Sequence, residues 1–484
     1  MNNAPIIDKL LQLNKQNMVS FHMPGHKNGR IYDKVLYKNF KDILYKLDTT
    51  EIEGTDNLHN AKEMIKESQQ KARRIFKSEE TFFLINGSTS GIYSMIMAAT
   101  SPGDKILIDR NCHQAIINAC ILGDLAPVYV YPDMDEKWGI AMEVSPDDIE
   151  TQLIKHNDIK AVVLTYPTYY GIVCNLKKVE KIVHKYDKML LIDEAHGAHL
   201  GLNKDLPLPA LSCGADAAVQ STHKTLPSFT QSSMLHIQGN RIDRDRLRFM
   251  LRIHQSSSPS YLLLSSLDFA VMVYETKGKC LMGDLLENIR DFRQKIKETD
   301  GIDIMGNDVM ENKDFKSMDI TRLWIGIKNI TGYELERRLR ENFNIQMELS
   351  NRYGVLGVAS IANTRYDFDK LLNALKEISE DAEGKRTEQL QNSVFRGNPA
   401  FENIEQVFTP REALYKSRKK ILFEKSQGCI SGEYIIPYPP GIPLVVPGER
   451  ISDEIIQQVM SIIDGGGEIL GLCDSSCRWI EAIT

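Results

Sequence analysis

A lysine at the end of an apolar run is the residue of this sequence with the clearest chemical potential. Residues 215–225 read Ala-Asp-Ala-Ala-Val-Gln-Ser-Thr-His-Lys-Thr, which predicts a buried strand ending in polar side chains, with Lys224 at its mouth. Open α/β sheets bind ligands outside the carboxyl ends of their strands, and an amine placed there can form a Schiff base. Most lysines are solvated surface residues, so Lys224 by itself leaves that interpretation open.

An aspartate ends a second apolar run. Residues 189–193 read Met-Leu-Leu-Ile-Asp and are followed by Glu-Ala-His-Gly. The segment from Asp193 to Lys224 is long enough for one connecting segment and one more strand. Both side chains can therefore reach the same end of one sheet. A carboxylate there could keep a pyridinium nitrogen protonated, as pyridoxal chemistry requires of its electron sink. Alternatively, Asp193 caps the turn that follows it.

A possible phosphate cradle follows a third strand-like run. Residues 81–85 are apolar and β-prone, residues 86–91 read Asn-Gly-Ser-Thr-Ser-Gly, and residues 92–100 predict a helix. Such a turn offers hydroxyls, backbone N–H groups and a helix N-terminus to an anion. It matches neither a Walker loop nor a dinucleotide fingerprint. A plain helix cap explains the turn when it is taken alone, but Asp193 and Lys224 together favour the phosphate cradle.

A fourth run, residues 105–109, leads into Arg-Asn-Cys-His at 110–113. The imidazole of His113 could lie over a planar ring, or it could be an ordinary polar residue at the start of a helix.

The elements that must position these residues form an α/β fold. Residues 60 to 275 alternate predicted helices and strands, which is typical of a mostly parallel sheet covered by helices on both faces. An apolar stripe predicts one helix in residues 61–76, and further helical sequence at 274–298 leads to a smaller α/β region. The expected division is an N-terminal arm and interface loop (1–59), a cofactor-binding large domain (60–290), a small α/β domain (291–380), a polar linker, and a C-terminal domain (394–484).

A proline-rich stretch, residues 437–447, cannot form a helix. Because Glu433, Tyr438 and Glu449 flank it, the stretch is either a rigid turn or a wall of the substrate pocket.

Composition excludes several classes of protein. The net charge of −6 over 484 residues argues against nucleic-acid binding, and no apolar run approaches the length of a membrane span. No signal peptide is visible, and eight scattered cysteines are typical of reduced cytoplasmic thiols. Cys473 and Cys477 lack a second ligand pair, so no metal site is expected.

Six motifs in order resemble the bacterial ornithine/lysine/arginine decarboxylases. They are Phe-His-Met-Pro-Gly-His-Lys (21–27), Gly-Thr-Asp-Asn-Leu-His (54–59), Arg-Asn-Cys-His (110–113), Asp-Glu-Ala-His-Gly (193–197), Ser-Thr-His-Lys (221–224) and Tyr-Pro-Pro-Gly-Ile-Pro (438–443). Chance agreement of all six is implausible, although each alone is only a hypothesis. The resemblance implies an aspartate-aminotransferase-like fold that binds pyridoxal 5'-phosphate, in the short form without an N-terminal wing domain.

The same resemblance implies a role for each site residue. Lys224 would form the Schiff base with the cofactor, Asp193 would pair with the pyridine nitrogen, and His113 would stack on the ring. His196 would lie beside the ring near the phenolic oxygen. The phosphate would be held by Ser88, Thr89, Ser221 and His223, and the substrate by Glu433 and Tyr438.

The implied reaction is decarboxylation of a basic amino acid, giving a polyamine or its precursor and carbon dioxide. Arginine is favoured over lysine and ornithine. One alternative is an aminotransferase or other lyase of the same fold, in which Arg365 would clamp the substrate carboxylate. The other is a regulatory homologue without activity.

The resemblance also implies a cytoplasmic homodimer, or a higher oligomer built of dimers, with shared active sites. The segments His22–Lys27 and Gly54–His59 are polar, contain glycine and lie far from Lys224 in sequence, so we expect them to reach across a two-fold interface. Alternatively, the arm folds on its own subunit.

Overall fold

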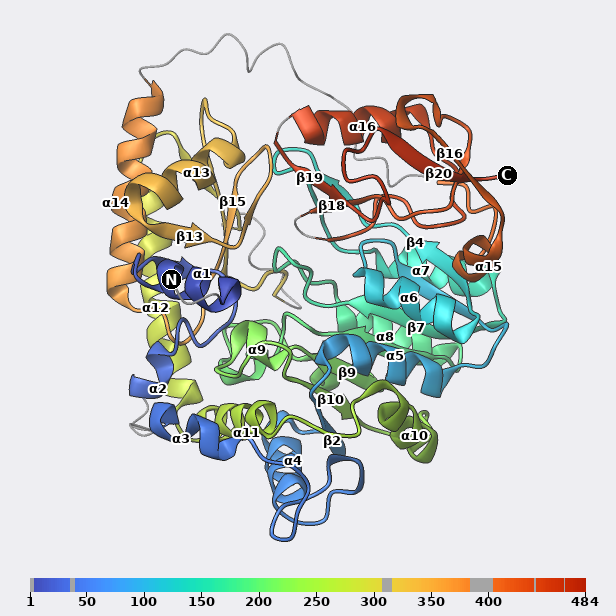
Figure 1. Ribbon diagram of the computed structural model, residues 1–484, viewed down its shortest axis with the longest axis horizontal. Helices are drawn as coiled ribbons and strands as arrows, with labels where there is room; N and C mark the ends of the chain where they lie inside the picture. The colour runs from blue at the N-terminus through green and yellow to red at the C-terminus, as the bar shows by residue number, and fades with distance from the viewer. Residues whose placement is uncertain (1–3, 35–39, 307–315, 384–403, 439–440, 465) are drawn as a thin grey trace.

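The structure is a computed structural model that describes residues 4–34, 40–306, 316–383, 404–438, 441–464 and 466–484. Figure 1 shows a large domain around a central sheet, a small domain containing α13 and α14, and a C-terminal domain containing α16. Most of the predicted linker, together with Pro439, Pro440 and Gly465, lies outside the described residues.

The large domain is built on a seven-stranded sheet with the order β2-β10-β9-β8-β7-β3-β4. Only β10 runs antiparallel to its neighbours, so the predicted, mostly parallel sheet is confirmed. The strands are β2 (Glu80–Leu84), β3 (Lys105–Asp109), β4 (Ala126–Val130), β7 (Ile159–Thr165), β8 (Met189–Asp193), β9 (Ala217–Gln220) and β10 (Ser233–Ile237).

Helices cover both faces of this sheet, which explains why its central strands are continuous apolar runs. Ile106, Leu107 and Ile108 of β3 are all fully buried although they point to alternate faces. One face packs on α5 (Gly87–Ala99), α6 (Gln114–Gly123) and α10 (Arg244–His254). The other packs on α4 (Met64–Phe76), α7 (Pro146–Lys155), α8 (Leu176–Lys185) and α11 (Tyr261–Thr276).

Local sequence signals set several helix ends. Ser145 accepts a hydrogen bond from the N–H of Asp147 and is followed by Pro146, so α7 begins with a side-chain cap and a proline in its first turn. Asn175 caps α8 and Ser260 caps α11 in the same way. The apolar stripe predicted in residues 61–76 is confirmed as α4, whose Ile65 and Ala72 are buried.

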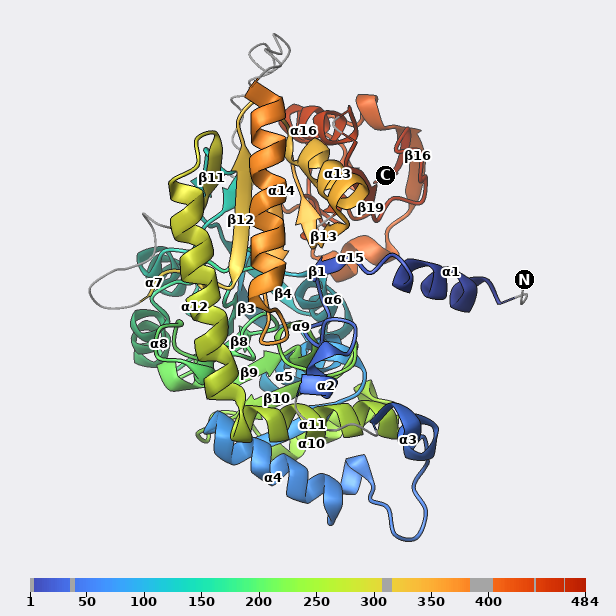
Figure 2. The ribbon, with the colours of Figure 1, turned by 90° about the vertical axis from the view of Figure 1, so that its left-hand side faces the viewer.

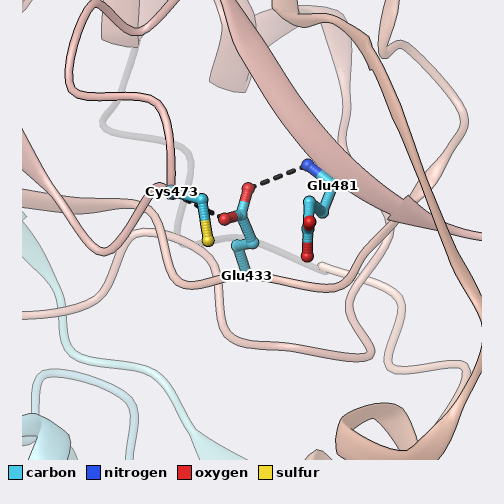
Figure 3. A group of neighbouring side chains, drawn as sticks. All are labelled: Glu433, Cys473 and Glu481. Atoms are coloured by element: carbon cyan, nitrogen blue, oxygen red, sulfur yellow. Dashed lines mark hydrogen bonds between the residues drawn. The ribbon is translucent and has the colours of Figure 1, made fainter.

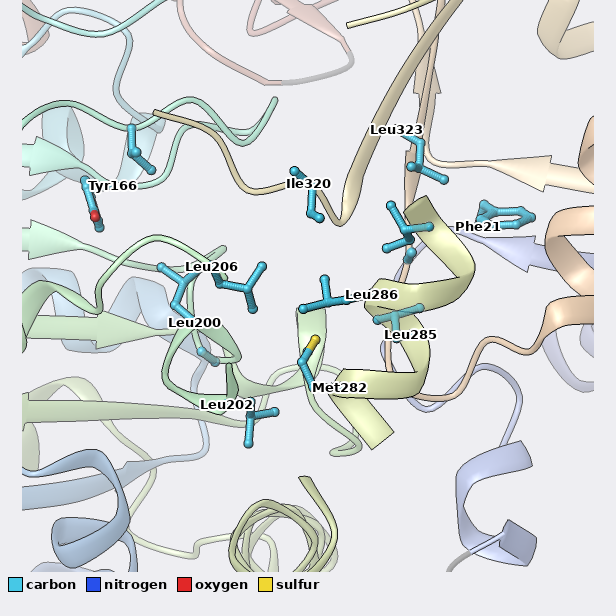
Figure 4. Close-up of a cluster of buried hydrophobic side chains, with 14 of the residues drawn as sticks. Phe21, Tyr166, Leu200, Leu202, Leu206, Met282, Leu285, Leu286, Ile320 and Leu323 are labelled. Atoms are coloured by element: carbon cyan, nitrogen blue, oxygen red, sulfur yellow. The ribbon is translucent and has the colours of Figure 1, made fainter. Parts of the chain in front are cut away.

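The small domain has a four-stranded antiparallel sheet, β11-β12-β15-β14. Its strands are β11 (Ile302–Ile304), β12 (Arg322–Ile327), β14 (Leu349–Ser350) and β15 (Val355–Val358), and its helices are α13 (Gly332–Phe343) and α14 (Arg365–Glu383). The long helix α12 (Gly278–Lys297) joins it to the large domain. Figure 4 shows the apolar cluster at this junction, where Leu285 and Leu286 of α12 lie near Ile320 and Leu323.

The N-terminal segment contributes a strand to the small domain. β1 (Val19–Phe21) pairs in parallel with β13 (Ile345–Met347), and all three β1 residues are buried. The N-terminal helices are α1 (Pro5–Asn14), α2 (Arg30–Lys34) and α3 (Phe40–Leu47). Figure 2 shows α1 projecting from the body of the molecule, and α1 has no buried residue.

The C-terminal domain consists of short strands and two helices. They are α15 (Pro410–Tyr415), β16 (Arg418–Leu422), β17 (Ile430–Ser431), β18 (Ile436–Tyr438), α16 (Asp453–Asp464), β19 (Glu468–Leu470) and β20 (Trp479–Ile483). It is joined to the large domain by Arg110, which donates to the carbonyls of Pro443 and Leu444 and to the carboxylate of Glu449 at 2.6–2.9 Å. Arg110 and Glu449 are fully buried, so this ion pair fixes the domain against the end of β3.

Short elements complete the chain. They are β5 (Met134–Asp135), β6 (Ile140–Ala141), α9 (Thr222–Thr225), and the 3-10 turns η1 (Leu58–Asn60), η2 (Leu200–Leu202), η3 (Ala210–Cys213) and η4 (Phe423–Lys425). Among the described helices, none has the length and apolar character that crossing a membrane requires.

Candidate active site

The neighbouring strands β8 and β9 bring Asp193 and Lys224 together, as predicted. The two strands are parallel, with Asp193 opposite Val219, and Lys224 follows in the short helix α9. Lys224 Nζ lies 2.9 Å from Nε2 of His196, which comes from the turn after β8. Burial lowers the pKa of Lys224, while the nearby Asp193 carboxylate raises it. The site therefore favours a neutral amine on Lys224, which is its nucleophilic form.

Asp193 is a buried carboxylate with few partners. Its Oδ1 accepts a 3.1 Å hydrogen bond from the N–H of Ala195, which is the turn-capping role that the sequence left open. Burial raises the pKa of Asp193, and the charge of Lys224 opposes that shift. The carboxylate is therefore held in the interior mainly by one backbone donor and one facing amine.

His196 links the end of β8, which carries Asp193, to Lys224. Burial lowers its pKa well below the ordinary range, and the charge of Lys224 lowers it further, so the imidazole is neutral. A neutral Nε2 can accept a hydrogen from the Lys224 amine. Its Nδ1 is buried without a hydrogen-bond partner among the described residues. Such a group marks a site where another polar atom is expected.

Three residues at this site were not predicted from the sequence. The ring of Tyr169 packs on the His196 ring with centroids 4.6 Å apart, and its hydroxyl donates to Glu348 at 2.6 Å. Arg322, fully buried, donates to the His196 carbonyl at 3.0 Å. Tyr169 follows the end of β7, so inspecting the residues beyond each parallel strand would have found it. Arg322 and Glu348 come from the small domain and have no comparable local signal.

The predicted phosphate residues also converge. Ser88 and Thr89 lie in the first turn of α5, and the hydroxyl of Ser221 donates to that of Ser88 at 2.8 Å. The helix begins at Gly87 rather than after residue 91 as predicted, so the Ser-Thr-Ser sequence is helical. Gly87 has a φ of +76°, which a residue with a side chain rarely adopts.

The opening turn of α5 and the neighbouring α9 together present polar groups that suit an anion. Its N-cap residue, Asn86, makes no side-chain capping bond, and Thr222 Oγ1, on α9, is buried without a partner among the described residues. His223 donates from Nδ1 to the Ser232 carbonyl at 2.9 Å, and burial lowers its pKa to about 4. Hydroxyls, a helix N-terminus and a neutral imidazole form a suitable donor set for a phosphate.

His113 lies near Lys224, since burial and the Lys224 charge together lower the pKa of His113 to about 4. Its side chain is exposed, and Nδ1 accepts a hydrogen bond of 3.1 Å from the N–H of Ala115. The residue is therefore the N-cap of α6, which is the alternative that the sequence left open. The capping bond uses one ring atom, and stacking on a cofactor through the ring face stays a prediction.

The segment His22–Lys27 packs on α9 of its own chain, and its contact with a partner subunit stays a prediction. Gly25 donates to the His223 carbonyl at 2.8 Å, and a Cβ at Gly25 would lie 2.8 Å from the carbonyl oxygen of Leu226. Lys27 is buried and donates to the carbonyls of His22 and Val358. The arm thus packs beside α9 in its own subunit, because only glycine allows the backbones to approach so closely.

Arg365, the expected carboxylate clamp of an aminotransferase, is at the surface. Its side chain is 69% exposed and lies 3.6 Å from Asp291 and 3.7 Å from Asp369. Its position at the start of α14 therefore does not support that alternative.

Glu433 serves as a structural tie in the C-terminal domain. Its carboxylate accepts hydrogen bonds from the N–H groups of Cys473 at 2.6 Å and Glu481 at 2.8 Å (Figure 3). The Cys473 thiol and the Glu481 carboxylate lie beside it, a grouping that could hold a metal ion. Both oxygens of Glu433 already accept backbone hydrogen bonds. Arg418 lies 3.6 Å from Glu481 and pairs with its negative charge, so residues of the chain itself stabilise the cluster.

Tyr438, the other residue predicted to contact the substrate, ends β18 and is half-exposed. Contact of Glu433 and Tyr438 with the substrate stays a prediction.

Two models of one protein family together match most of the chain. The family described as Orn/Lys/Arg decarboxylase, major domain, matches residues 4–334, and its C-terminal domain matches residues 388–467. An arginine decarboxylase of Bacillus subtilis is 34% identical over 482 residues, which are 99% of this chain and 98% of that protein.

Solved structures confirm the predicted fold. A lysine decarboxylase from Francisella novicida aligns with a TM-score of 0.78 at 22% identity, covering 95% of this chain and 78% of that one. An alanine–glyoxylate aminotransferase from Nostoc sp. aligns with a TM-score of 0.51 at 17% identity, covering 65% of this chain and 86% of that one. The large domain therefore has the predicted aminotransferase-like architecture.

Proposed function

Because this chain belongs to the Orn/Lys/Arg decarboxylase family, we propose that it decarboxylates arginine at the strand ends that carry Asp193, His196 and Lys224. That it is a decarboxylase of basic amino acids follows from the family, as the motifs predicted. The observation that supports this location best is the buried contact of Lys224 Nζ with His196, next to Asp193 and the open turn of α5.

The proposed cofactor is pyridoxal 5'-phosphate, and the residues present suit its three parts. Lys224 would bind its aldehyde carbon, Asp193 its ring nitrogen, and the exposed face of His113 its ring. Ser88, Thr89, Ser221 and His223 would hold its phosphate. When bound, the cofactor supplies a conjugated, positively charged ring that accepts the electrons left behind by carbon dioxide.

Lys224 and His196 would donate and accept protons at the reacting carbon. Burial lowers the pKa of Lys224, which favours the neutral amine that acts as a nucleophile. His196 stays neutral and lies 2.9 Å away, where it orients the amine and can accept one of its hydrogens. Arg322 and Tyr169 fix the imidazole from the carbonyl side and the ring side.

Asp193 would hold a proton on the ring nitrogen of the cofactor. Its carboxylate has one backbone donor and is otherwise surrounded by protein, so a cationic N–H is a strong partner for it. A buried carboxylate without such a partner is costly, and this is why burial raises the pKa of Asp193.

Loss of carbon dioxide is favoured when the substrate carboxylate is weakly paired, because its negative charge moves away in the transition state. Arg365 lies at the surface with acidic partners, and the inner Arg322 donates to the His196 carbonyl and to Thr321. The surface position of Arg365 and the bonds of the two terminal Arg322 nitrogens within the chain favour decarboxylation over transamination.

Arginine is proposed as the substrate because the 34% identical Bacillus subtilis relative, matched over nearly its whole length, is an arginine decarboxylase. The test measures carbon dioxide released from arginine, lysine and ornithine at equal concentrations. The highest kcat/KM with arginine is expected. Preference for lysine or ornithine would contradict the substrate assignment, and release from none of the three would contradict the function.

We also propose that a second copy of the chain covers the open side of the site. The loop before η1 exposes Ile52, and His59 bonds the carbonyl of Ser256 at 2.8 Å, next to Asn86 of the phosphate turn. Phe249 and Ile253 of α10 are also more than half exposed nearby. Mixing Lys224→Ala chains with chains disabled in the Gly54–His59 loop should restore part of the activity. Mixed dimers without recovery would contradict shared sites at that loop.

A further inference from the structure

A row of buried polar side chains crosses four neighbouring strands of the large sheet. Ser78 and Thr81 share a hydrogen bond of 2.7 Å, and Thr81 Oγ1 lies 2.8 Å from Nδ1 of His236. His236 Nε2 lies 3.1 Å from Oε1 of Gln220, whose Nε2 donates to Glu194 at 2.7 Å. The row runs from β2 through β10 and β9 to the residue after β8, so it follows the order of the strands.

The row is isolated from solvent by apolar packing. Glu194, Gln220, His236 and Thr81 are each at most 3% exposed. The ring of Phe76, at the end of α4, packs on His236 with centroids 4.7 Å apart. Polar groups in such surroundings gain stability only when every one of them is paired.

The hydrogen bonds of the row all point the same way, so each group has one assignment as donor or acceptor. Both oxygens of Glu194 accept hydrogen bonds, one from Gln220 and one from the N–H of Ala210 at 2.7 Å. Gln220 therefore turns its oxygen toward His236, which must donate from Nε2 and accept at Nδ1 from the Thr81 hydroxyl. Burial lowers the pKa of His236 to about 3, which agrees with this neutral tautomer. Burial raises the pKa of Glu194 to about 8, while the bonds from Gln220 and Ala210 favour its charged form. Because two N–H donors face its two oxygens, Glu194 orders the whole row as a carboxylate.

The row continues the strand pairing at the point where the active-site residues begin. The backbone ladder between β8 and β9 ends with Asp193 opposite Val219. The next residues on the two strands are Glu194 and Gln220, and their side chains bond each other. Asp193 directly precedes one partner, and Ser221 directly follows the other. The side-chain bond therefore joins the chain at Asp193 to the turn that carries Lys224.

Stability alone is a poor explanation for this arrangement, because an apolar row of the same volume is often as stable or more stable. We propose that Glu194, Gln220, His236 and Thr81 form a positioning network that sets the spacing between Asp193 and the Ser221–Lys224 turn, and so the binding of pyridoxal phosphate. The inference rests on the proposed cofactor site. It adds residues that act through Asp193 and Lys224 without contacting the cofactor.

A reciprocal exchange tests the network. Gln220→Glu places two carboxylates face to face, and Glu194→Gln leaves an amide hydrogen directed at another donor. The double variant E194Q/Q220E restores every bond. The amide introduced at position 194 can accept from Ala210 and donate to the carboxylate introduced at position 220, which can accept from His236. Leu153→Ala, at a buried position of α7, is a control for lost stability without lost pairing.

The measurements are the Kd for pyridoxal phosphate added to apo protein, the visible circular dichroism of the bound cofactor, and the urea midpoint. We expect each single variant to raise the Kd about tenfold or more and to weaken the dichroism, since misplaced groups are costly at this scale. The double variant should return both toward wild type. Leu153→Ala should lower the urea midpoint and leave the Kd within about twofold.

Single variants that unfold more easily but keep the wild-type Kd and dichroism would overturn the network. If they do not fold, the double variant decides the matter: a folded double variant that binds cofactor as wild type supports the network, and one with weakened binding contradicts it. Should the wild type bind no pyridoxal phosphate through Lys224, the proposed cofactor site fails first. If instead the wild type binds pyridoxal phosphate and all variants bind it with the same Kd, the network alone fails.

Discussion

Two buried carboxylates in different domains of this molecule, Asp193 and Glu433, are held by different numbers of hydrogen bonds. At the ends of β8 and β9, Asp193 has one backbone donor, and Nδ1 of the nearby His196 has no partner among the described residues. In the C-terminal domain, both oxygens of Glu433 accept backbone hydrogen bonds. The chain thus supplies Asp193 with fewer hydrogen bonds than Glu433.

This difference separates a binding site from a structural tie. Buried polar groups normally find partners, so a group left without one indicates either strain or a missing molecule. A saturated carboxylate such as Glu433 instead stabilises the loops that it joins. Both residues were predicted from sequence as site residues, and only their surroundings distinguish them. The comparison predicts that substitutions in the first region affect chemistry and those in the second affect folding.

The largest effect is expected for Lys224→Ala, which should abolish decarboxylation. Lys224 supplies the amine beside His196 and Asp193, and removing it leaves no nucleophile at that position. Steady-state carbon dioxide release measures the effect, with Lys277→Ala, a residue between α11 and α12, as a control. Near-normal activity in Lys224→Ala would mean that the chemistry lies elsewhere.

Asp193→Asn should reduce kcat by several orders of magnitude while the cofactor still binds. A neutral amide cannot favour a protonated ring nitrogen, although it keeps the size of the side chain. The measurement is kcat together with the absorbance of bound pyridoxal phosphate. A loss below about tenfold, roughly 1.4 kcal/mol, would refute the role given to this carboxylate.

Glu433→Gln should destabilise the chain by about 1–3 kcal/mol and change kcat/KM little, because the amide leaves one backbone donor facing an N–H group. Urea unfolding and arginine kinetics measure the two effects. Glu424→Gln, at an exposed position of the same domain, is the matched control. If Glu433→Gln lowers kcat/KM strongly at unchanged stability, Glu433 contacts the substrate and the comparison breaks down.

The smallest effect concerns pH. Burial lowers the pKa of His236 from 6.5 to about 3 in the folded chain. Between these values the unfolded chain binds the proton and the folded chain does not, so stability falls as the pH drops below 6.5. His236→Phe should reduce that slope by up to about 1.4 kcal/mol per pH unit, the value for one proton. An unchanged slope in pH-dependent urea unfolding would show that His236 is protonated in the folded state.

The strand ends were predictable from the sequence because apolar runs and the residues that end them are local signals. Asp193 and Lys224 needed only two such runs and the rule that parallel strands share an edge. The start of α5 was placed too late, because Gly-Ser-Thr-Ser-Gly is typical of a turn, yet here it forms the first helical turn.

Side-chain partners across the chain could not be predicted. The contact of Gln220 with Glu194 depends on strand register, and that of Tyr169 with Glu348 depends on how the small domain packs. The packing of Gly25 against Leu226 was not predicted, since a glycine signals only a close approach and not which backbone it approaches. Such long-range contacts leave no pattern in a single sequence.

The lysine that binds the cofactor determines where the active site lies. The measurement is mass spectrometry of peptides from protein loaded with pyridoxal phosphate and reduced with sodium borohydride, which makes the lysine–cofactor bond permanent. We predict the added mass on the peptide that contains Lys224, and its loss in Lys224→Ala. Modification of a different lysine in the wild type, with Lys224 unmodified in an active preparation, would contradict the assignment of the active site to the ends of β8 and β9.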